Sequence, residues 1–458
     1  MKAAPGRVLG ILLGAAVVVV LAIPIGRGRA DAPARVNGRA PLQVVGDAPI
    51  FAGAARVPIE VPAGAPLAGH PGFRRAAAPG IVQARALALR AGATQVLLVS
   101  IETLLVPGEL EAEVLRRAGL SADSCLLLAA THTHSGPGGT WNSLAAELSG
   151  NGRYDPAVRD SIAQSAADAI RSAIGALRLS RFHAVSERWE GGPAVARSGG
   201  PVEGRLTAFQ ARDDLGVIGT VVVYGMHPTV LPRDSRTPSG DWPAAASGAI
   251  EETTGATALV FQGAGGDATW DRRGLAGDPA AMAESVGARV AAEAMRALAP
   301  TKAVSGAPLR CDVQLVSLPP AHASVRVPWV LRRGVSNLLS LFADPYAVVS
   351  RIGVAGLHLQ GVPGEPVGAL SRDGMQLVGL ADGYLGYIED PKRATAGEGE
   401  SGRTYYGAGL ASALGITEER ALPATGGGRR PEHTATQQKV AGPKDVVQSK
   451  PMRLGIDF

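Results

Sequence analysis

The sequence predicts an α/β fold in which mixed β-sheets are flanked by helices and the active site lies in loops at strand ends. Short apolar runs alternate along the chain with segments of helical periodicity, which is typical of this fold class. Run after run is followed by a polar or small-residue cluster, and ligands of α/β folds collect at such strand ends. A length of 458 residues and a hydrophobic content of 46% are sufficient to bury a large core.

Composition and periodicity divide the chain into four segments. We expect a signal peptide or membrane anchor at residues 1–32, a linker at 33–48, one catalytic domain at 49–422, and a low-complexity, disordered tail at 423–458. In the first segment, basic residues flank an apolar run that is slightly short for a full membrane span. Cleavage of this segment and its retention as an anchor both stay open, and either one predicts export from the cytoplasm.

Charge and cysteine content limit the classes of partner. The net charge of +5 is modest, and the scattered arginines are accompanied by no nucleic-acid motif. We therefore exclude nucleic acid as a partner and expect at most a preference for anionic membrane surfaces.

Cys125 lies in an apolar run, far from Cys311 in the sequence. We expect buried free thiols, although an exported protein is able to form a disulfide.

Apolar runs rich in Val, Leu and Ile predict the strands, and Ala-rich or amphipathic segments predict the helices. In chain order we expect strands at residues 95–100, 125–130, 182–189, 258–262, 313–318, 354–360 and 376–380, and a hairpin at 209–226. The sequence D-D-L-G at 213–216 supplies the turn of that hairpin. We expect helices at residues 109–118, 155–177, 243–253 and 279–297.

The sequence T-H-T-H-S-G-P-G-G at residues 131–139 directly follows an apolar run that is typical of a buried strand. Side chains alternate along a strand, so His132 and His134 are expected to project to the same side. The following Gly-Pro-Gly-Gly forms a loop, because it continues neither a strand nor a helix. Two imidazoles beside such a loop suit a metal or acid/base site. A chance pair of exposed histidines is the alternative.

Other expected strands also end in residues that carry chemistry. They are His227 in M-H-P-T, Asp267 and Thr269 in G-G-D-A-T, Glu365 in P-G-E-P, and Tyr387. Catalytic zinc usually takes three protein ligands from histidines and carboxylates and leaves one position for water. Two histidines and a glutamate from separate strand ends would meet that need. Each of these residues also fits a structural role, and sequence spacing alone does not show that they converge.

Together these motifs resemble the catalytic domain of neutral, non-lysosomal ceramidases, zinc enzymes that hydrolyse the amide bond of ceramide. The resemblance extends from about residue 50 to about residue 415. It rests on T-H-T-H-S-G-P-G-G, M-H-P-T at 226–229, V-P-G-E at 362–365, G-L-A-D-G-Y-L-G-Y at 379–387 and T-Y-Y-G-A at 404–408. It implies a zinc ion held by His132, His227, Glu365 and Tyr387. It also implies a catalytic group of His134 as proton donor, Arg197 beside the substrate carbonyl, and Tyr405 as a substrate contact.

The chemistry that the resemblance implies follows from these residue types. Zinc lowers the pKa of bound water toward ~7 and polarises the amide carbonyl. Glu365, or another nearby base, is expected to help remove the proton of that water, and His134 is expected to protonate the leaving amine. Arg197 and the backbone amides of Gly265 and Gly266 are expected to stabilise the oxyanion.

The chain departs from the family pattern in two places. Thr269 stands where the family has a serine. We expect its hydroxyl to orient ligand beside Asp267 and never to carry the acyl group, because metal-bound water is already a competent nucleophile. The C-terminal β-sandwich of better-known family members is not expected, because the sequence ends soon after Ala408.

The leading interpretation is an exported zinc amidohydrolase that acts on ceramide or a similar N-acyl lipid; its oligomeric state stays open. Two alternatives are an amidase for another N-acyl compound and a catalytically silent envelope binding protein that keeps the fold. The stretch 325–342 mixes Trp329 and leucines with Arg326, Arg332 and Arg333, which is typical of segments at a membrane surface. A buried helix and loop is the alternative there.

Overall fold

The computed structural model describes residues 42–43, 48–121, 124–197, 202–273, 277–304, 308–323 and 327–416. The expected signal or anchor, the expected tail and most of the expected linker therefore lie outside the described residues. Within the described ranges, no helix is long and apolar enough to span a membrane.

An eight-stranded mixed sheet has the strand order β10-β9-β8-β6-β2-β3-β4-β5. In that order its strands are Thr257–Gln262, Gly216–Tyr224, Arg205–Asp213, Arg178–Arg188, Ile50–Val61, Gly80–Ala91, Thr94–Ile101 and Cys125–Ala130. The two edge strands, β10 and β5, run parallel to their neighbours. Parallel neighbours need a crossover, and the helices α5 (Asp241–Thr254) and α2 (Gly108–Ala118) lie in these two connections.

The large sheet curves until its two edges come close to each other. Ser100 Oγ in β4 donates to Val260 O in β10 over 2.8 Å. Gln262 Nε2, at the end of β10, donates to Thr131 O just after β5 over 2.9 Å. The curvature therefore brings together the two loops that follow the edge strands, which carry His132, His134 and Asp267.

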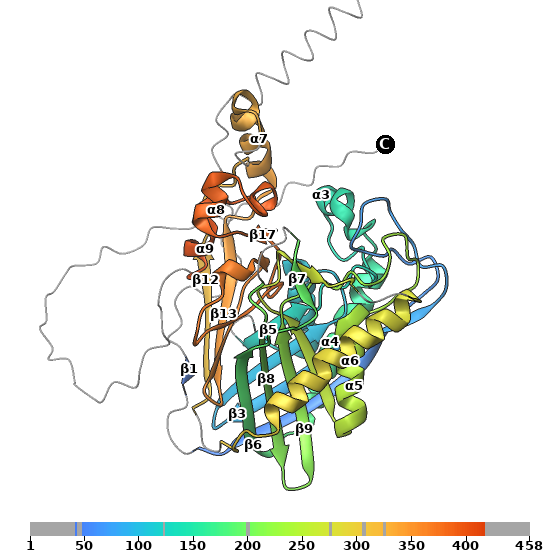
Figure 1. The fold of residues 1–458 in the computed structure, drawn as a ribbon, viewed down its shortest axis with the longest axis vertical. Helices are drawn as coiled ribbons and strands as arrows, with labels where there is room; N and C mark the ends of the chain where they lie inside the picture. Colours follow the sequence, from blue (N-terminus) through green and yellow to red (C-terminus); the bar gives the residue numbers. More distant parts are fainter. Residues whose placement is uncertain are drawn as a thin grey trace, which may run out of the picture. The chain divides into compact units, whose positions relative to one another are not determined.

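A five-stranded sheet, of order β1-β12-β13-β14-β16, packs against one face of the large sheet (Figure 1). In that order its strands are Leu42–Gln43, Arg310–Ser317, Tyr346–Val354, Leu357–Gly361 and Gln376–Val378. Leu127, Phe209 and Leu359 are among the buried side chains between the sheets. A disulfide between Cys125 and Cys311 joins β5 to β12, with the Cα atoms 6.1 Å apart. The prediction of free thiols is therefore wrong, because stacking of the two sheets brings together residues 186 positions apart.

Helices cover the opposite face of the large sheet (Figure 1). The helix α4 (Pro156–Gly175) packs on β2 and β3, and α6 (Pro279–Leu298) packs on α5. Asp155 caps the start of α4 by accepting hydrogen bonds from backbone amides of its first turn. Neighbouring residues of β3 divide between the layers: Ala86 faces the helices and Leu87 faces the five-stranded sheet.

Several short elements complete the described fold. They are β7 (Ala194–Ala196), β11 (Ala268–Trp270), β15 (Glu365–Pro366), β17 (Tyr387–Ile388), α3 (Leu144–Ala146), a π-helical turn at Glu147–Asn151, α7 (Trp329–Phe342), α8 (Pro391–Ala396) and α9 (Leu410–Ala413). The strands β15 and β17 pair in parallel, with Glu365 opposite Tyr387. Two residues of the predicted site thus lie side by side on one small sheet.

The predicted helices and most predicted strands are confirmed, with ends shifted by a few residues. The strand expected at 354–360 begins only at Leu357 as β14, because the stretch opens with the turn of the hairpin β13–β14. Ala355 and Gly356 form that turn with φ angles of 53° and 81°. Alanine rarely adopts positive φ, so the apolar run continues through the turn without a sequence signal.

Candidate metal centre

His132 and His134 lie in the loop that follows β5. The strand ends at Ala130, so the predicted strand alternation does not extend to the two histidines. Instead His132 adopts a φ of 68°, in the left-handed region that non-glycine residues seldom occupy. This turn places the two imidazole rings with centroids 5.0 Å apart. The rings are neighbours as predicted, but backbone strain and not strand geometry brings them together.

The hydrogen bonds of His132 and His227 fix which ring nitrogen carries hydrogen. His132 Nδ1 lies 2.8 Å from Leu104 O, and His227 Nδ1 lies 3.1 Å from Gly265 O. A carbonyl oxygen only accepts, so both Nδ1 atoms carry hydrogen, and in the neutral form of each ring Nε2 is the acceptor. Burial lowers the pKa of His227, which favours the neutral ring.

Glu365 faces the two Nε2 atoms. Its Oε2 lies 3.3 Å from His132 Nε2 and 3.0 Å from His227 Nε2. Burial raises the pKa of the Glu365 carboxyl, but the two facing rings outweigh burial and hold that pKa well below its usual range. Oε2 is buried without a hydrogen-bond donor. Two ring nitrogens and one carboxylate oxygen thus converge, and a divalent cation that replaces the ring hydrogens between them would be held by all three atoms.

A cavity of about 10 Å³ lies where these atoms converge. Its lining includes His132, His227, Gly266, Glu365 and Leu380. This volume is about what one water molecule or ion needs. The donor set and the space therefore both fit a single metal ion.

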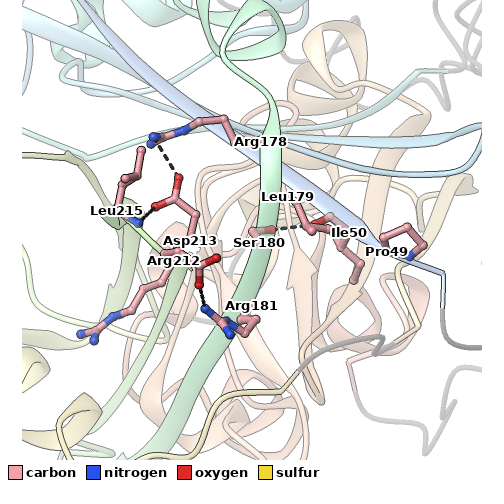
Figure 2. Close-up of a pocket in the computed structure, with 10 residues that line it drawn as sticks. Pro49, Ile50, Arg178, Leu179, Ser180, Arg181, Arg212, Asp213 and Leu215 are labelled. Atoms are coloured by element: carbon pink, nitrogen blue, oxygen red, sulfur yellow. Dashed lines mark hydrogen bonds and ion pairs between the residues drawn. The ribbon is translucent and has the colours of Figure 1, made fainter.

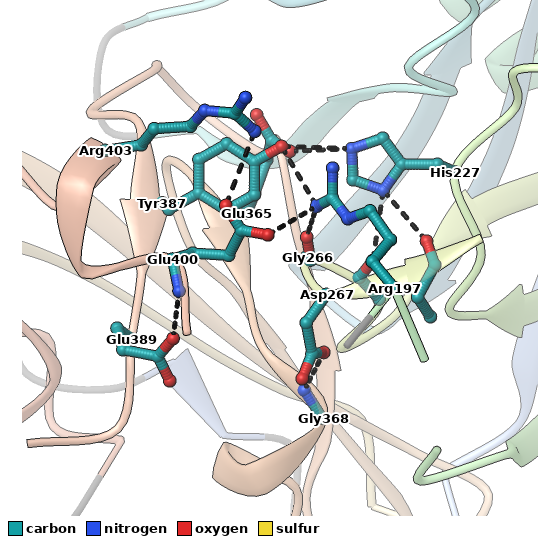
Figure 3. A network of polar contacts seen from close by, with 12 residues as sticks. Arg197, His227, Gly266, Asp267, Glu365, Gly368, Tyr387, Glu389, Glu400 and Arg403 are labelled. Atoms are coloured by element: carbon teal, nitrogen blue, oxygen red, sulfur yellow. Dashed lines mark hydrogen bonds and ion pairs between the residues drawn. The ribbon is translucent and has the colours of Figure 1, made fainter. Parts of the chain in front are cut away.

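Tyr387 and Arg197 extend this group of contacts (Figure 3). The Tyr387 hydroxyl lies 3.2 Å from His227 Nε2, and Arg197 Nη2 donates to the same hydroxyl over 3.2 Å. Burial raises the pKa of Tyr387, so the free phenol keeps its hydrogen and donates it to His227. The structure therefore places all four predicted metal ligands, together with Arg197, in one cluster.

His134 offers an alternative ligand. Ligand atoms of His132, His134 and His227 all lie within 4.8 Å of one another, so three histidines are also able to hold a metal ion. Both ring nitrogens of His134 are buried without a partner, and burial lowers its pKa well below the ordinary value. The ring is therefore neutral, which suits either a metal ligand or a proton carrier. Both ligand sets share His132 and His227.

The side chains of the other predicted residues make contacts outside the histidine group. Asp267 Oδ1 accepts a hydrogen bond from Gly368 N over 2.8 Å, and its Oδ2 lies 3.6 Å from Arg393 Nη1. Thr269 lies in β11, opposite Val195 of β7. Tyr405 is 42% exposed. Asp267 thus joins two loops in this structure, and the roles predicted for Thr269 and Tyr405 stay predictions.

The predicted oxyanion contacts from Gly265 and Gly266 are wrong. Gly265 N donates to Gly263 O and Gly266 N donates to Pro366 O, each over 2.8 Å. The first hydrogen bond lies within the loop after β10, and the second attaches this loop to β15. Both amides are thus already used within the chain.

Four residues near the centre were not predicted as site residues. Tyr384 donates to Glu365 Oε1 over 2.7 Å, and the His70 ring lies 4.9 Å from that of His134. Glu400 and Arg403 lie beside Tyr387 (Figure 3). Tyr384 had a signal in the sequence, since it stands in the same G-L-A-D-G-Y-L-G-Y motif as Tyr387. The other three stand in segments without periodicity, where the sequence pattern does not indicate which way a side chain points.

A larger cavity of about 670 Å³ lies elsewhere, beside the β8–β9 turn (Figure 2). Its lining includes the charged residues Arg178, Arg181, Arg212, Asp213 and Asp214. Arg178 pairs with Asp213 and Arg181 pairs with Asp214. The cavity contains none of the predicted site residues, so its size does not make it the reactive centre.

The fold and this site define an α/β domain with a buried histidine–carboxylate centre that fits one divalent metal ion. No family model matches the sequence, and no curated protein matches it either. A neutral ceramidase from Pseudomonas aeruginosa shares the fold, with a TM-score of 0.68 at 17% sequence identity, over 81% of this chain and 73% of that chain. A ceramidase solved in complex with C2 gives a TM-score of 0.67 at 18% identity, over 81% and 74% of the two chains. The predicted α/β, ceramidase-like fold is therefore confirmed.

Proposed function

We propose that this protein belongs to the neutral ceramidase family and hydrolyses the amide bond of ceramide or a similar N-acyl lipid, releasing a fatty acid and an amine. The observation that carries the proposal is the convergence of His132 Nε2, His227 Nε2 and the ionised Oε2 of Glu365. The likeness of the fold to two ceramidases supports the substrate class.

Zinc is the metal we propose, held by His132, His227 and Glu365, with Tyr387 as a fourth contact. Histidine and carboxylate ligands suit zinc, and a bound zinc ion supplies a Lewis acid and an activated water. The carbonyls of Leu104 and Gly265 orient the two rings, as hydrogen-bond partners of metal-bound histidines do.

The remaining side chains supply the proton and charge steps. His134 has two ring nitrogens without partners, so it is able to pass a proton to the leaving amine nitrogen. The Arg197 guanidinium lies against Tyr387 and is the cation we assign to the substrate carbonyl oxygen. Thr269 is proposed to orient ligand without forming a covalent bond.

The experiment is metal analysis of the purified full chain combined with hydrolysis assays on two substrates. We expect about one zinc per chain and turnover of a fluorescent N-acyl sphingosine, with both lost in His132→Ala. Turnover of a water-soluble N-acyl amino acid alone would favour the alternative amidase. A protein that takes up no zinc and hydrolyses neither compound would instead be the silent binding protein, and the proposal would be wrong.

Exposed apolar side chains at the start of α7 suggest how a lipid substrate is reached. At the start of α7, Trp329, Val330 and Leu331 are 81%, 62% and 56% exposed. Figure 1 places this helix at the same end of the domain as β17, which carries Tyr387. The basic Arg333 is exposed beside them, and α7 contains no acidic residue. We propose that this apolar and basic tip rests on an anionic membrane surface.

Export from the cytoplasm is the proposed localisation. The Cys125–Cys311 disulfide supports it, because disulfides form and persist in oxidising compartments. The signal-like layout of residues 1–32 points the same way.

A further inference from the structure

Two guanidinium groups and one carboxylate surround the Tyr387 ring (Figure 3). The guanidinium carbons of Arg197 and Arg403 each lie 5.4 Å from the centroid of the ring. Glu400 joins the two cations: its Oε1 is 3.2 Å from Arg197 Nη2, and its Oε2 is 3.4 Å from Arg403 Nη1. One carboxylate therefore serves both cations that flank the tyrosine.

The charges explain why this arrangement is stable. A guanidinium near the face of a tyrosine ring is attracted by the ring's electron density. Two guanidinium groups beside the same ring also repel each other. The carboxylate of Glu400 between them offsets that repulsion, so Arg197 and Arg403 are able to stay on the ring together.

The main chain holds Glu400 in place. Its backbone N–H donates to Glu389 Oε2 over 2.6 Å, and Glu389 is almost fully buried. The preceding Gly399 has a φ of 54°, and a Cβ there would lie only 2.1 Å from Glu389 Oε2. Only glycine allows the backbone to approach the buried carboxylate so closely. The direction of the Glu400 side chain is therefore set by the fold.

We propose that Glu400 and Arg403 are positioning residues of the metal centre. Through Arg197 they keep the Tyr387 hydroxyl against His227 Nε2, where the structure has it at 3.2 Å. They also fix the Arg197 guanidinium, which donates to the Tyr387 hydroxyl and to Gly266 O. The consequence for catalysis rests on the proposed function, whereas the coupling between these side chains is independent of it.

The first measurement needs neither metal nor substrate. A double-mutant cycle of Arg197→Gln and Glu400→Gln is measured by denaturant unfolding of the full chain without metal. We expect the pair to be coupled by at least about threefold in the unfolding equilibrium constant. The control cycle uses Glu113 and Arg116 of α2, a pair of the same residue types whose arginine is 67% exposed and whose glutamate is 19% exposed. Its coupling should be about twofold or less.

The second measurement separates positioning from general stability. In the zinc-loaded enzyme, Glu400→Gln should keep its zinc, lower kcat about tenfold and leave KM within about threefold. Arg403→Gln should act in the same direction, and Glu113→Gln should change nothing. Exogenous guanidinium should partly restore activity to Arg197→Ala but not to the Arg197→Ala/Glu400→Gln double variant.

The outcomes distinguish the two proposals. Absence of coupling in the metal-free cycle, or an unchanged kcat in Glu400→Gln, would overturn the positioning role. A protein that hydrolyses no N-acyl substrate contradicts the proposed function, and the metal-free cycle still decides on the positioning role.

Discussion

Tyr384→Phe tests whether the hydroxyl on Glu365 supports metal binding. Tyr384 donates to Glu365 Oε1 over 2.7 Å, and Oε2 of the same carboxylate faces the two histidines. A hydrogen bond to a charged group contributes about 1.5–3 kcal/mol, and loss of a hydrogen bond that orients a metal ligand typically costs 10–100-fold in affinity. We therefore expect the zinc dissociation constant to rise about 10–100-fold, or about 1.4–2.8 kcal/mol.

The assay is competition for zinc against a chromophoric chelator at fixed pH. Tyr406→Phe is the matched control, because Tyr406 is also buried and donates its hydroxyl hydrogen to a backbone oxygen, that of Asp344. Its zinc affinity should match that of the wild type, while its unfolding free energy falls by about 1 kcal/mol. If Tyr384→Phe binds zinc within twofold of the wild type, the carboxylate does not depend on this hydroxyl and the reasoning is refuted.

Three further predictions follow from the site, the disulfide and the apolar tip. His134→Ala should keep its zinc and lose turnover; loss of zinc on metal analysis would favour the three-histidine ligand set. Replacing both Cys125 and Cys311 by alanine should lower the unfolding free energy by about 2–5 kcal/mol in denaturant titrations, and an unchanged midpoint would contradict a stabilising disulfide. Trp329→Ala should weaken co-sedimentation with anionic liposomes several-fold, while Leu215→Ala, at an exposed site on the β8–β9 turn, should not; equal binding would exclude the tip as the membrane contact.

The sequence predicts which residues form the site better than it predicts the tertiary arrangement that brings them together. His132, His227, Glu365 and Tyr387 stand in short motifs at strand ends, and the structure brings all four together. Their convergence depends on contacts between the large sheet and the separate β15–β17 pair, and no local pattern encodes these contacts. Side-chain alternation correctly predicts neighbouring rings for His132 and His134, but the positive φ of His132 is the actual cause.

Residues that act through tertiary contacts had no sequence signal. Glu400 and Arg403 stand in a polar loop, and only their distances to Arg197 and Tyr387 single them out. The pairing of Cys125 with Cys311 was missed for the same reason, because it depends on how two sheets stack. The amides of Gly265 and Gly266 illustrate the opposite error. Their glycine-rich loop suggests an anion site, yet both amides already donate within the chain.

The pairing of residues after β5 with the β15–β17 sheet has a consequence for the order of assembly. His132 and His134 follow β5, near residue 130. Glu365 and Tyr387 are more than two hundred residues further along the chain. Contacts of such long sequence separation form late and slowly, because closing the intervening chain costs entropy. We expect a ribosome-bound chain that has not reached Tyr387 to hold zinc weakly. A chain that crosses a membrane unfolded would then take up its metal ion only after translocation, from the compartment in which folding ends.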